Sequence, residues 1–325
     1  MLTKNTKIVM TLGPASNCIN TLKSMLSVCN TIRLNRAHFS YDELEKALKM
    51  LTKLKNDYSF SIVLDLQGAK TRIGKMPSTD KLPDNIRLVN SLVSDDISVV
   101  PVPHTNVFKQ TTVGDSLLLN DRKIVLKVIE MNDTCIHTQV IKNGPISSFK
   151  GINSPDKSFE FAQINNNDQI AIEIANSLID VDYAVSFVNE GKQADIISPY
   201  INKEKSKLIA KIEQKKAFDN LYDIDFRFDE TWLCRGDLGA EAGLADLGKL
   251  QNNFIKCLAK MKKPALIAGE VLGSMVEMPQ PSRAEIVQLY DAINSGFSGF
   301  VLSDETAVGK NIEKIVSFIS DMIKS

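Results

Sequence analysis

The chain has 325 residues, of which 43% are apolar, and its 39 basic residues balance its 39 acidic ones. This balance gives no electrostatic reason to bind a nucleic acid, and no apolar run approaches the length of a membrane span. The five cysteines are far apart and form no C-x-x-C pair, which argues against a disulfide framework or a structural zinc site. We therefore expect a cytoplasmic protein whose cysteines are reduced thiols in a large core.

Eight short apolar runs, rich in β-branched residues, recur along the chain. Because they lack polar alternation, they are typical of parallel strands that are covered on both faces. The runs lie at 7–12, 31–35, 61–66, 183–187, 207–212, 231–235, 265–269 and 299–303. Helical periods lie between or after them, at 21–29, 41–55, 167–179, 247–261 and 282–296. The repeated order of strand and helix predicts an α/β protein with a (β/α)8 TIM barrel.

One long segment interrupts this order. Residues 75–156 hold no long helical period, and alternating segments lie there between turn-rich stretches, at 115–121, 123–131 and 134–144. We expect residues 75–156 to form a small β domain inserted after the third strand, while 1–74 and 157–325 form the barrel.

Polar residues, most of them charged, close almost every apolar run. In a barrel of this kind the active site lies at the carboxyl ends of the strands. The residues at these ends are Arg33, Asn35, Asp65, Lys211, Glu213, Asp237, Glu270, Asp304 and Glu305. Any one of them could be a capping or salt-bridging residue. Together they indicate a site, because so many charges around one barrel mouth need partners of comparable charge.

Four of these residues suggest a particular chemistry. Glu213 and Asp237 follow neighbouring strands, and two carboxylates with room for water and substrate are typical protein ligands of magnesium. Lys211 lies two residues before Glu213 and so points to the same side of its strand, where its ammonium group could meet a phosphoryl group. Arg33 offers a bidentate fork for phosphate. These residues predict a metal-assisted site for a phosphorylated, carboxylated anion.

The order of the motifs along almost the whole chain resembles that of the pyruvate kinase family. The matching stretches are TKIVMTLGPAS (6–16), IRLN (32–35) with His38 behind it, LDLQGAKTRIG (64–74), KGINSP (150–155), AVSFV (184–188), AKIEQ (210–214), CRGDLGAE (234–241), SMVEMPQPSRAE (274–285) and LSDETAVGK (302–310). The resemblance implies a barrel with a mobile lid domain inserted after strand three.

The resemblance also implies a reaction and a role for each site residue. The phosphoryl group of phosphoenolpyruvate would move to ADP, which gives pyruvate and ATP. Glu213 and Asp237 would bind the catalytic Mg²⁺ or Mn²⁺, and Lys211 would stabilise the transferring phosphoryl group. The remaining implied roles are phosphate binding for Arg33, nucleotide binding for Asn35, His38 and Arg72, and binding of the substrate carboxylate by the backbone amides of Gly236 and Asp237.

The residues of the potassium site depart from the family pattern. Potassium-dependent members have a serine, a threonine and a glutamate where this chain has Ala37, Leu66 and Lys70. A lysine at the last position resembles the potassium-independent branch, in which the ammonium group replaces the ion. We therefore expect Lys70, beside Asp65, to act as a monovalent-cation surrogate, so that K⁺ is not required.

The seventh strand departs further. Gly269 replaces a threonine whose hydroxyl helps to hold the substrate in the family, and Glu270 follows it. Loss of one such donor can cost roughly 10²–10³ in rate. One interpretation is a slowed ordinary kinase, in which Gly269 still borders the substrate. The other is altered chemistry with Glu270 as an acid, such as a metal-dependent oxo-acid lyase or decarboxylase. A non-catalytic protein that binds phosphoenolpyruvate or a nucleotide is a third hypothesis.

The family's C-terminal regulatory domain has no counterpart in this sequence, which stops a helix after the eighth strand. We expect no sugar-phosphate regulation and a homodimer formed through barrel surfaces.

Overall fold

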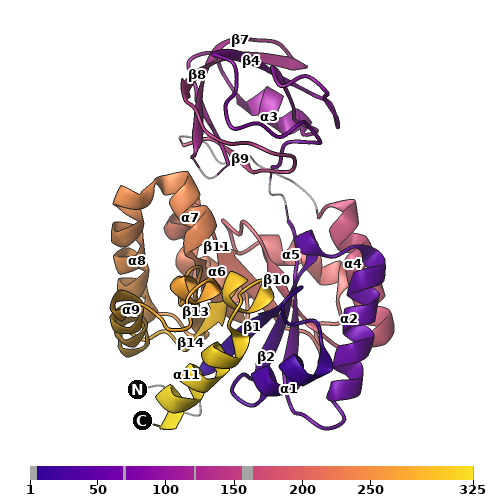
Figure 1. The fold of residues 1–325 in the computed structure, drawn as a ribbon, viewed down its shortest axis with the longest axis vertical. Coiled ribbons are helices and arrows are strands. Elements are labelled where there is room, and N and C mark those ends of the chain that lie inside the picture. Colours follow the sequence, from indigo (N-terminus) through magenta and orange to yellow (C-terminus); the bar gives the residue numbers. More distant parts are fainter. Residues whose placement is uncertain (1–5, 69–70, 121, 156–163, 325) are drawn as a thin grey trace. The chain divides into compact units, whose positions relative to one another are not determined.

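The computed structural model describes residues 6–68, 71–120, 122–155 and 164–324. The chain divides into two compact units (Figure 1). The first unit comprises residues 1–68, 164–236 and 248–325, and the second comprises 69–163 and 237–247.

The first unit is built on a closed barrel of eight parallel strands, as the sequence predicts. Each of the eight predicted runs contains or overlaps one barrel strand. The strands are β1 (Lys7–Leu12), β2 (Thr31–Asn35), β3 (Ser61–Asp65), β10 (Asp182–Val185), β11 (Leu208–Ile212), β12 (Glu230–Cys234), β13 (Ala265–Ala268) and β14 (Gly299–Leu302). β14 pairs with β1 and closes the barrel.

The barrel interior is filled by side chains from alternate positions of the strands. Trp232 is the largest of them and is 1% exposed, and every residue of β11 and β12 is buried. The interior cluster consists of Val9, Val63, Ala184, Ile209, Trp232, Cys234, Leu266, Ala268 and Val301. Because both faces of each strand are covered, the sequence shows apolar runs rather than alternation.

Helices surround the barrel strands (Figure 1). The predicted helices match within about three residues the observed α1 (Ile19–Leu26), α2 (Tyr41–Leu54), α4 (Asn166–Leu178), α8 (Leu244–Leu258) and α9 (Arg283–Asn294). Ser40 with Glu43 and Ser282 with Glu285 form capping boxes that fix the starts of α2 and α9. The further helices of the first unit are α5 (Gln193–Ile197), α6 (Leu221–Arg227), α10 (Asp304–Ala307) and α11 (Ile312–Lys324). α7 (Arg235–Ala242) begins in the first unit, and its residues from Asp237 onward belong to the second.

The second unit contains a six-stranded sheet with its own apolar core. The sheet order is β5-β4-β8-β7-β6-β9. Its elements are β4 (Asn85–Val89), β5 (Val99–Pro101), α3 (Thr105–Gln110), β6 (Ser116–Leu119), β7 (Ile124–Met131), β8 (Cys135–Lys142) and β9 (Ile152–Asn153). The sequence predicted β6, β7 and β8 but missed β4, β5 and β9. β5 and β9, with three and two residues, are too short to show an alternating period. This unit confirms the predicted inserted β domain as a part of the fold.

The prediction of core thiols is wrong for part of the cysteine set. All five cysteines are free, and Cys29 and Cys234 are buried, but Cys18 is exposed and Cys135 and Cys257 are half-buried. Cys18 precedes α1 directly, and helix ends lie at the surface. None of the helices in the part of the chain that the structure describes is long and apolar enough to cross a lipid bilayer.

Candidate active site

Four charged side chains meet at the carboxyl ends of three barrel strands. Arg33 comes from β2, Asp65 ends β3, Lys211 lies in β11, and Glu213 follows β11 directly. Their side chains are 9%, 1%, 11% and 2% exposed, respectively. The parallel pairing of β2 with β3 brings Arg33 and Asp65 together although 32 residues separate them in sequence.

Lys211 is the centre of this cluster. Its Nζ lies 3.0 Å from Asp65 Oδ1 and 3.0 Å from Glu213 Oε1, and it donates a hydrogen bond of 2.8 Å to Ser186 Oγ. Burial by itself would lower the pKa of Lys211, but the carboxylates of Asp65 and Glu213 raise it above its ordinary value. The side chain is therefore held as a cation at a fixed point.

Arg33 binds the other side of Asp65. Its Nε donates to Asp65 Oδ2 at 2.7 Å, and its Nη2 lies 2.6 Å from the same oxygen. Its Nη1 donates to Thr11 Oγ1 at 2.9 Å and to Ser303 Oγ at 3.3 Å. Burial would lower the pKa of Arg33, but the charge of Asp65 and its hydrogen bond raise it. Side chains from β1, β3 and the end of β14 thus orient the guanidinium group.

The cluster is neutral as a whole, since Arg33 and Lys211 carry two positive charges and Asp65 and Glu213 two negative ones. The charged residues at the strand ends therefore serve, in part, as partners for one another. Such a network of buried charges is costly to desolvate, and removal of one member leaves an uncompensated charge. An anionic ligand that contacts Lys211 or Arg33 would compete with Asp65 for the same positive groups.

Glu213 has a second anchor in the backbone. The amide of Phe187 donates to Glu213 Oε2 at 2.9 Å, and Phe187 adopts a left-handed conformation with φ of 58°. One carboxylate oxygen thus faces a backbone amide and the other faces Lys211. The Glu213 carboxylate is thus held in one orientation, and its oxygens are hard ligands of the kind that Mg²⁺ prefers.

Asp237 lies in the first turn of α7, which begins immediately after β12. Gly236 is exposed, and a Cβ built on it would meet no atom within 4 Å. Among the residues that the structure describes, no group of three or more His, Cys, Asp or Glu side chains is arranged to hold a metal ion. A magnesium ion commonly takes only one or two carboxylates and completes its shell with water and phosphate oxygens, so a single oriented carboxylate such as that of Glu213 has suitable donor chemistry.

The turn after β13 has an unusual backbone. Gly269 and Glu270 both have positive φ, at 89° and 50°. The Arg235 guanidinium holds this turn, because its Nε and Nη2 donate to Gly269 O at 2.9 and 2.6 Å and Nη2 also donates to Glu270 O at 3.1 Å. A Cβ on Gly269 would lie 3.0 Å from the Gly236 amide nitrogen. The family's threonine would be strained in this backbone conformation.

The side chain of Glu270, which the sequence suggests as an alternative acid, is exposed. Its carbonyl, not its carboxylate, makes the contact with Arg235. Asp304 is also exposed and begins α10. Glu305 is buried and accepts the amides of Leu272 at 3.1 Å and Ser303 at 2.7 Å, so it joins the ends of β13 and β14. Burial raises the pKa of Glu305.

Several residues that orient the cluster are not among those predicted from the sequence. Ser186 contacts Lys211, Thr11 and Ser303 contact Arg33, and Arg235 holds the β13 turn. Each of them lies in, or within two residues of, a predicted strand, and that position was the available signal. Small hydroxyl side chains are common there for many reasons, so the signal alone does not select them.

The family model described as "Pyruvate kinase, barrel domain" matches residues 3–316. The chain belongs to the pyruvate kinase family. A pyruvate kinase from Thermotoga maritima is 31% identical over 330 residues, which cover 99% of this chain and 71% of the relative. One from Buchnera aphidicola subsp. Schizaphis graminum is 34% identical and covers 99% of this chain and 69% of the relative.

A solved structure of pyruvate kinase from Pyrobaculum aerophilum matches with a TM-score of 0.87 at 26% identity. The match covers 100% of this chain and 74% of the neighbour. The fold is therefore the barrel and inserted β domain of the pyruvate kinases, a family of kinase-type phosphotransferases that acts on phosphoenolpyruvate or pyruvate and ADP or ATP.

The residues that the family resemblance assigns to the nucleotide lie in both units. Asn35 caps a short 3₁₀ helix, Arg36–His38, by accepting the amide of Ala37 at 3.2 Å. Arg72 belongs to the second unit, where its Nη1 donates to Phe149 O at 2.8 Å. Lys70, the expected cation surrogate, lies outside the described residues.

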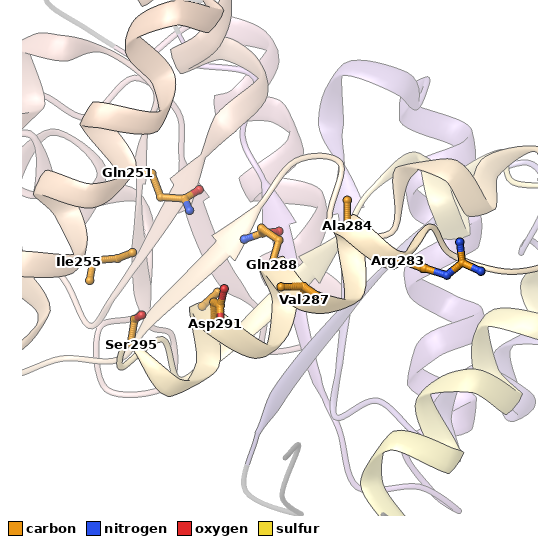
Figure 2. Close-up of a pocket in the computed structure, with 9 residues that line it drawn as sticks. Gln251, Ile255, Arg283, Ala284, Val287, Gln288, Asp291 and Ser295 are labelled. Carbon is orange, nitrogen blue, oxygen red and sulfur yellow. The ribbon is translucent and has the colours of Figure 1, made fainter.

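A separate cavity of about 480 Å³ lies between α8 and α9 (Figure 2). Ile255 and Gln251 line it from α8, and Val287 and Gln288 line it from α9. None of the four cluster residues borders it. Arg283 and Asp291 also line it, but it lies on the outer helices and borders none of the strand-end residues, so it is not a candidate for the active site.

Proposed function

We propose that this chain transfers the phosphoryl group of phosphoenolpyruvate to ADP, forming pyruvate and ATP, with Mg²⁺ or Mn²⁺ as the metal. The observation that carries the proposal is the Lys211 ammonium group, fixed between Asp65 and Glu213 with Arg33 beyond Asp65. Phosphoryl transfer develops charge on the transferred group, and catalysis depends on cations placed in advance. The buried pair of Lys211 and Arg33 meets this need.

Each residue of the cluster has a part in this proposal. Lys211 binds the transferring phosphoryl oxygens, and its position is set by Ser186 and the two carboxylates. Arg33 binds phosphate while Asp65 holds its guanidinium group in one orientation. Gly236 and Asp237 present their amides to the substrate carboxylate. Gly236 is suited to this because no atom lies near the position of a Cβ, which leaves the backbone approachable.

Glu213 and Asp237 are the proposed metal ligands. When bound there, a divalent cation neutralises phosphate charge and favours formation of the enolate. The Phe187 amide orients Glu213. Asp237 lies in the first turn of α7, directly after β12. Asn35, His38 and Arg72 are proposed to contact the nucleotide.

Activity without potassium is proposed as well. Lys70 replaces a glutamate of the potassium-dependent members, and Ala37 and Leu66 lack the hydroxyl groups found there. Leu66 is buried and contributes its carbonyl to Ser186 Oγ instead. We expect the same rate in sodium and potassium buffers, and a Lys70→Glu variant that needs K⁺.

The direct test is pyruvate formation from phosphoenolpyruvate and ADP, followed by coupled oxidation of NADH by lactate dehydrogenase. We expect turnover with Mg²⁺ or Mn²⁺ and none in EDTA. Lys211→Met should lower kcat by about 10²-fold or more, which is the scale for loss of one electrostatic contact to the transition state. Lys314→Met, an exposed lysine on α11, is the matched control and should behave as wild type. Absence of pyruvate from the wild-type protein under all metal conditions would overturn the proposal.

The turn at Gly269 and Glu270 motivates a second candidate function, a metal-dependent lyase or decarboxylase of an oxo-acid. Gly269 lacks the hydroxyl of the family's threonine, and both residues of this turn have positive φ. Turnover of oxaloacetate that survives Lys211→Met, without kinase activity, would favour this reaction. A thermal shift with phosphoenolpyruvate and Mg²⁺ but no turnover of either substrate would instead indicate a binding protein.

A homodimer is also proposed, from the resemblance alone. Size-exclusion chromatography with multi-angle light scattering at micromolar concentration measures it, and a mass of 36.0 kDa would refute it.

A further inference from the structure

A buried carboxylate holds the turn that follows β3, where the chain leaves the barrel unit. Asp168 is 0% exposed. Its Oδ1 accepts the amide of Gln67 at 2.9 Å, and its Oδ2 accepts the amide of Gly68 at 2.8 Å. Gly68 has φ of 62°, and a Cβ on it would lie 2.9 Å from the Cβ of Ser186. The turn therefore has one tightly fixed conformation.

Asn165 completes the hold from the segment that returns to the barrel unit. Its Nδ2 donates to Gly68 O at 2.7 Å and to Asp168 Oδ2 at 2.6 Å. Its Oδ1 accepts the amide of Asp168 at 2.8 Å and caps α4. Asn165 and Asp168 thus bind to Gln67 and Gly68 although about 100 residues lie between the two segments. We call these four residues the clamp.

The clamp is linked by contacts to Lys211. Leu66 directly precedes the clamp, and its amide donates to Ala184 O at 2.9 Å. Ser186 Oγ donates to Leu66 O at 2.8 Å, and Lys211 Nζ donates to Ser186 Oγ at 2.8 Å. A displacement of the Gln67–Gly68 turn would move Leu66 O, and with it the hydroxyl group that orients the lysine.

We propose that Asn165 and Asp168 are positioning residues for the reaction: they fix the Gln67–Gly68 turn and, through Leu66 and Ser186, the place of Lys211. The proposal rests on the proposed function for its kinetic part. An ordinary helix cap requires only the Asn165 Oδ1 contact to the Asp168 amide. The clamp adds three hydrogen bonds to the turn that follows β3, and it buries the Asp168 carboxylate. A helix cap needs neither feature.

Two variants separate the clamp from the cap. Asn165→Ser keeps a side-chain oxygen that can cap α4, but it removes the Nδ2 donor to Gly68 O. In the wild type both carboxylate oxygens of Asp168 accept a backbone amide. The side chain of Asp168→Asn has only one oxygen, so its NH2 group would face the N–H donor of Gln67 or Gly68. Ser282→Ala removes the cap of α9 and is the matched control for loss of a cap elsewhere.

Amide hydrogen exchange and steady-state kinetics then test the proposal. In both clamp variants we expect at least about tenfold faster exchange of Gln67 and Gly68. We also expect faster exchange of Val188, whose amide donates to Lys211 O at 3.2 Å. Per folded molecule, kcat should fall about tenfold or more, while KM for phosphoenolpyruvate changes little, because misplacement of Lys211 affects the transition state more than binding. Ser282→Ala should show neither effect.

Each outcome decides the proposal. Unchanged exchange at Gln67 and Gly68 refutes the clamp, and faster exchange there with wild-type kcat refutes its positioning role. A fall in kcat that Ser282→Ala reproduces also refutes it, since it would then reflect general loss of stability. If the wild-type protein forms no pyruvate, the proposed function fails separately. The Val188 amide then decides, because unchanged exchange there would show that the clamp does not reach Lys211.

Discussion

Replacement of Lys211 by methionine is the sharpest test of how the buried charges stabilise the barrel. In the wild-type cluster two cations and two anions balance. Lys211→Met leaves Arg33 paired with Asp65 and removes the cation that lies 3.0 Å from Glu213 Oε1. The variant therefore buries one uncompensated negative charge, on a side chain that is 2% exposed.

The magnitude follows from the contact distances. Two unit charges at 3.0 Å attract each other by roughly 5 kcal/mol at an effective dielectric constant of about 20. Removal of one partner of a buried pair costs about 3–5 kcal/mol, since the other loses its compensation. Glu213→Gln alone should also destabilise the protein, because it leaves the opposite imbalance. The double variant restores neutrality, so its loss should fall short of the sum of the single losses by about 2 kcal/mol.

Urea unfolding measures these free energies in EDTA, so that no bound metal contributes. Trp232 is the chain's one tryptophan, is 1% exposed, and pairs with Lys211 in the register of β11 and β12. Its fluorescence therefore reports unfolding of the barrel. Lys314→Met should stay within about 0.5 kcal/mol of wild type. Single losses below about 1 kcal/mol, or additive losses in the double variant, would contradict the argument.

Two more predictions concern backbone strain and pH. Gly269→Ala should lower the free energy of unfolding by about 1–3 kcal/mol, because φ is 89° and the new Cβ would lie 3.0 Å from the Gly236 nitrogen. Gly248 lies within α8, and a Cβ there would meet no atom within 4 Å, so Gly248→Ala should be neutral or stabilising in the same urea experiment. Equal changes in the free energy of unfolding for the two variants would rule out backbone strain at Gly269. Burial raises the pKa of Asp168 from 3.8 to about 6. The protonated carboxyl group therefore contributes to the free energy of unfolding fully below pH 3.8, and this contribution is lost as the pH rises through about 6. Wild type should therefore gain up to about 3 kcal/mol over Asp168→Asn between about pH 7 and pH 4, whereas parallel pH curves would show that burial does not control this carboxyl.

The sequence by itself determined the barrel and part of the site. Strands covered on both faces must be apolar at every position, so β11 and β12 were visible as continuous runs. Side chains two residues apart on a strand share a face, and this local geometry predicted that Lys211 and Glu213 would point the same way. The structure has their charged atoms 3.0 Å apart.

Only the tertiary structure decided which distant residues meet. Arg33 binds Asp65 because β2 and β3 pair in one register, and Asp168 reaches the Gln67–Gly68 turn across about 100 residues of chain. No period in the sequence encodes such contacts, because they depend on how separate segments pack. The positive φ angles of Gly269 and Glu270 have the same origin, since Arg235 from the neighbouring strand end holds both carbonyls.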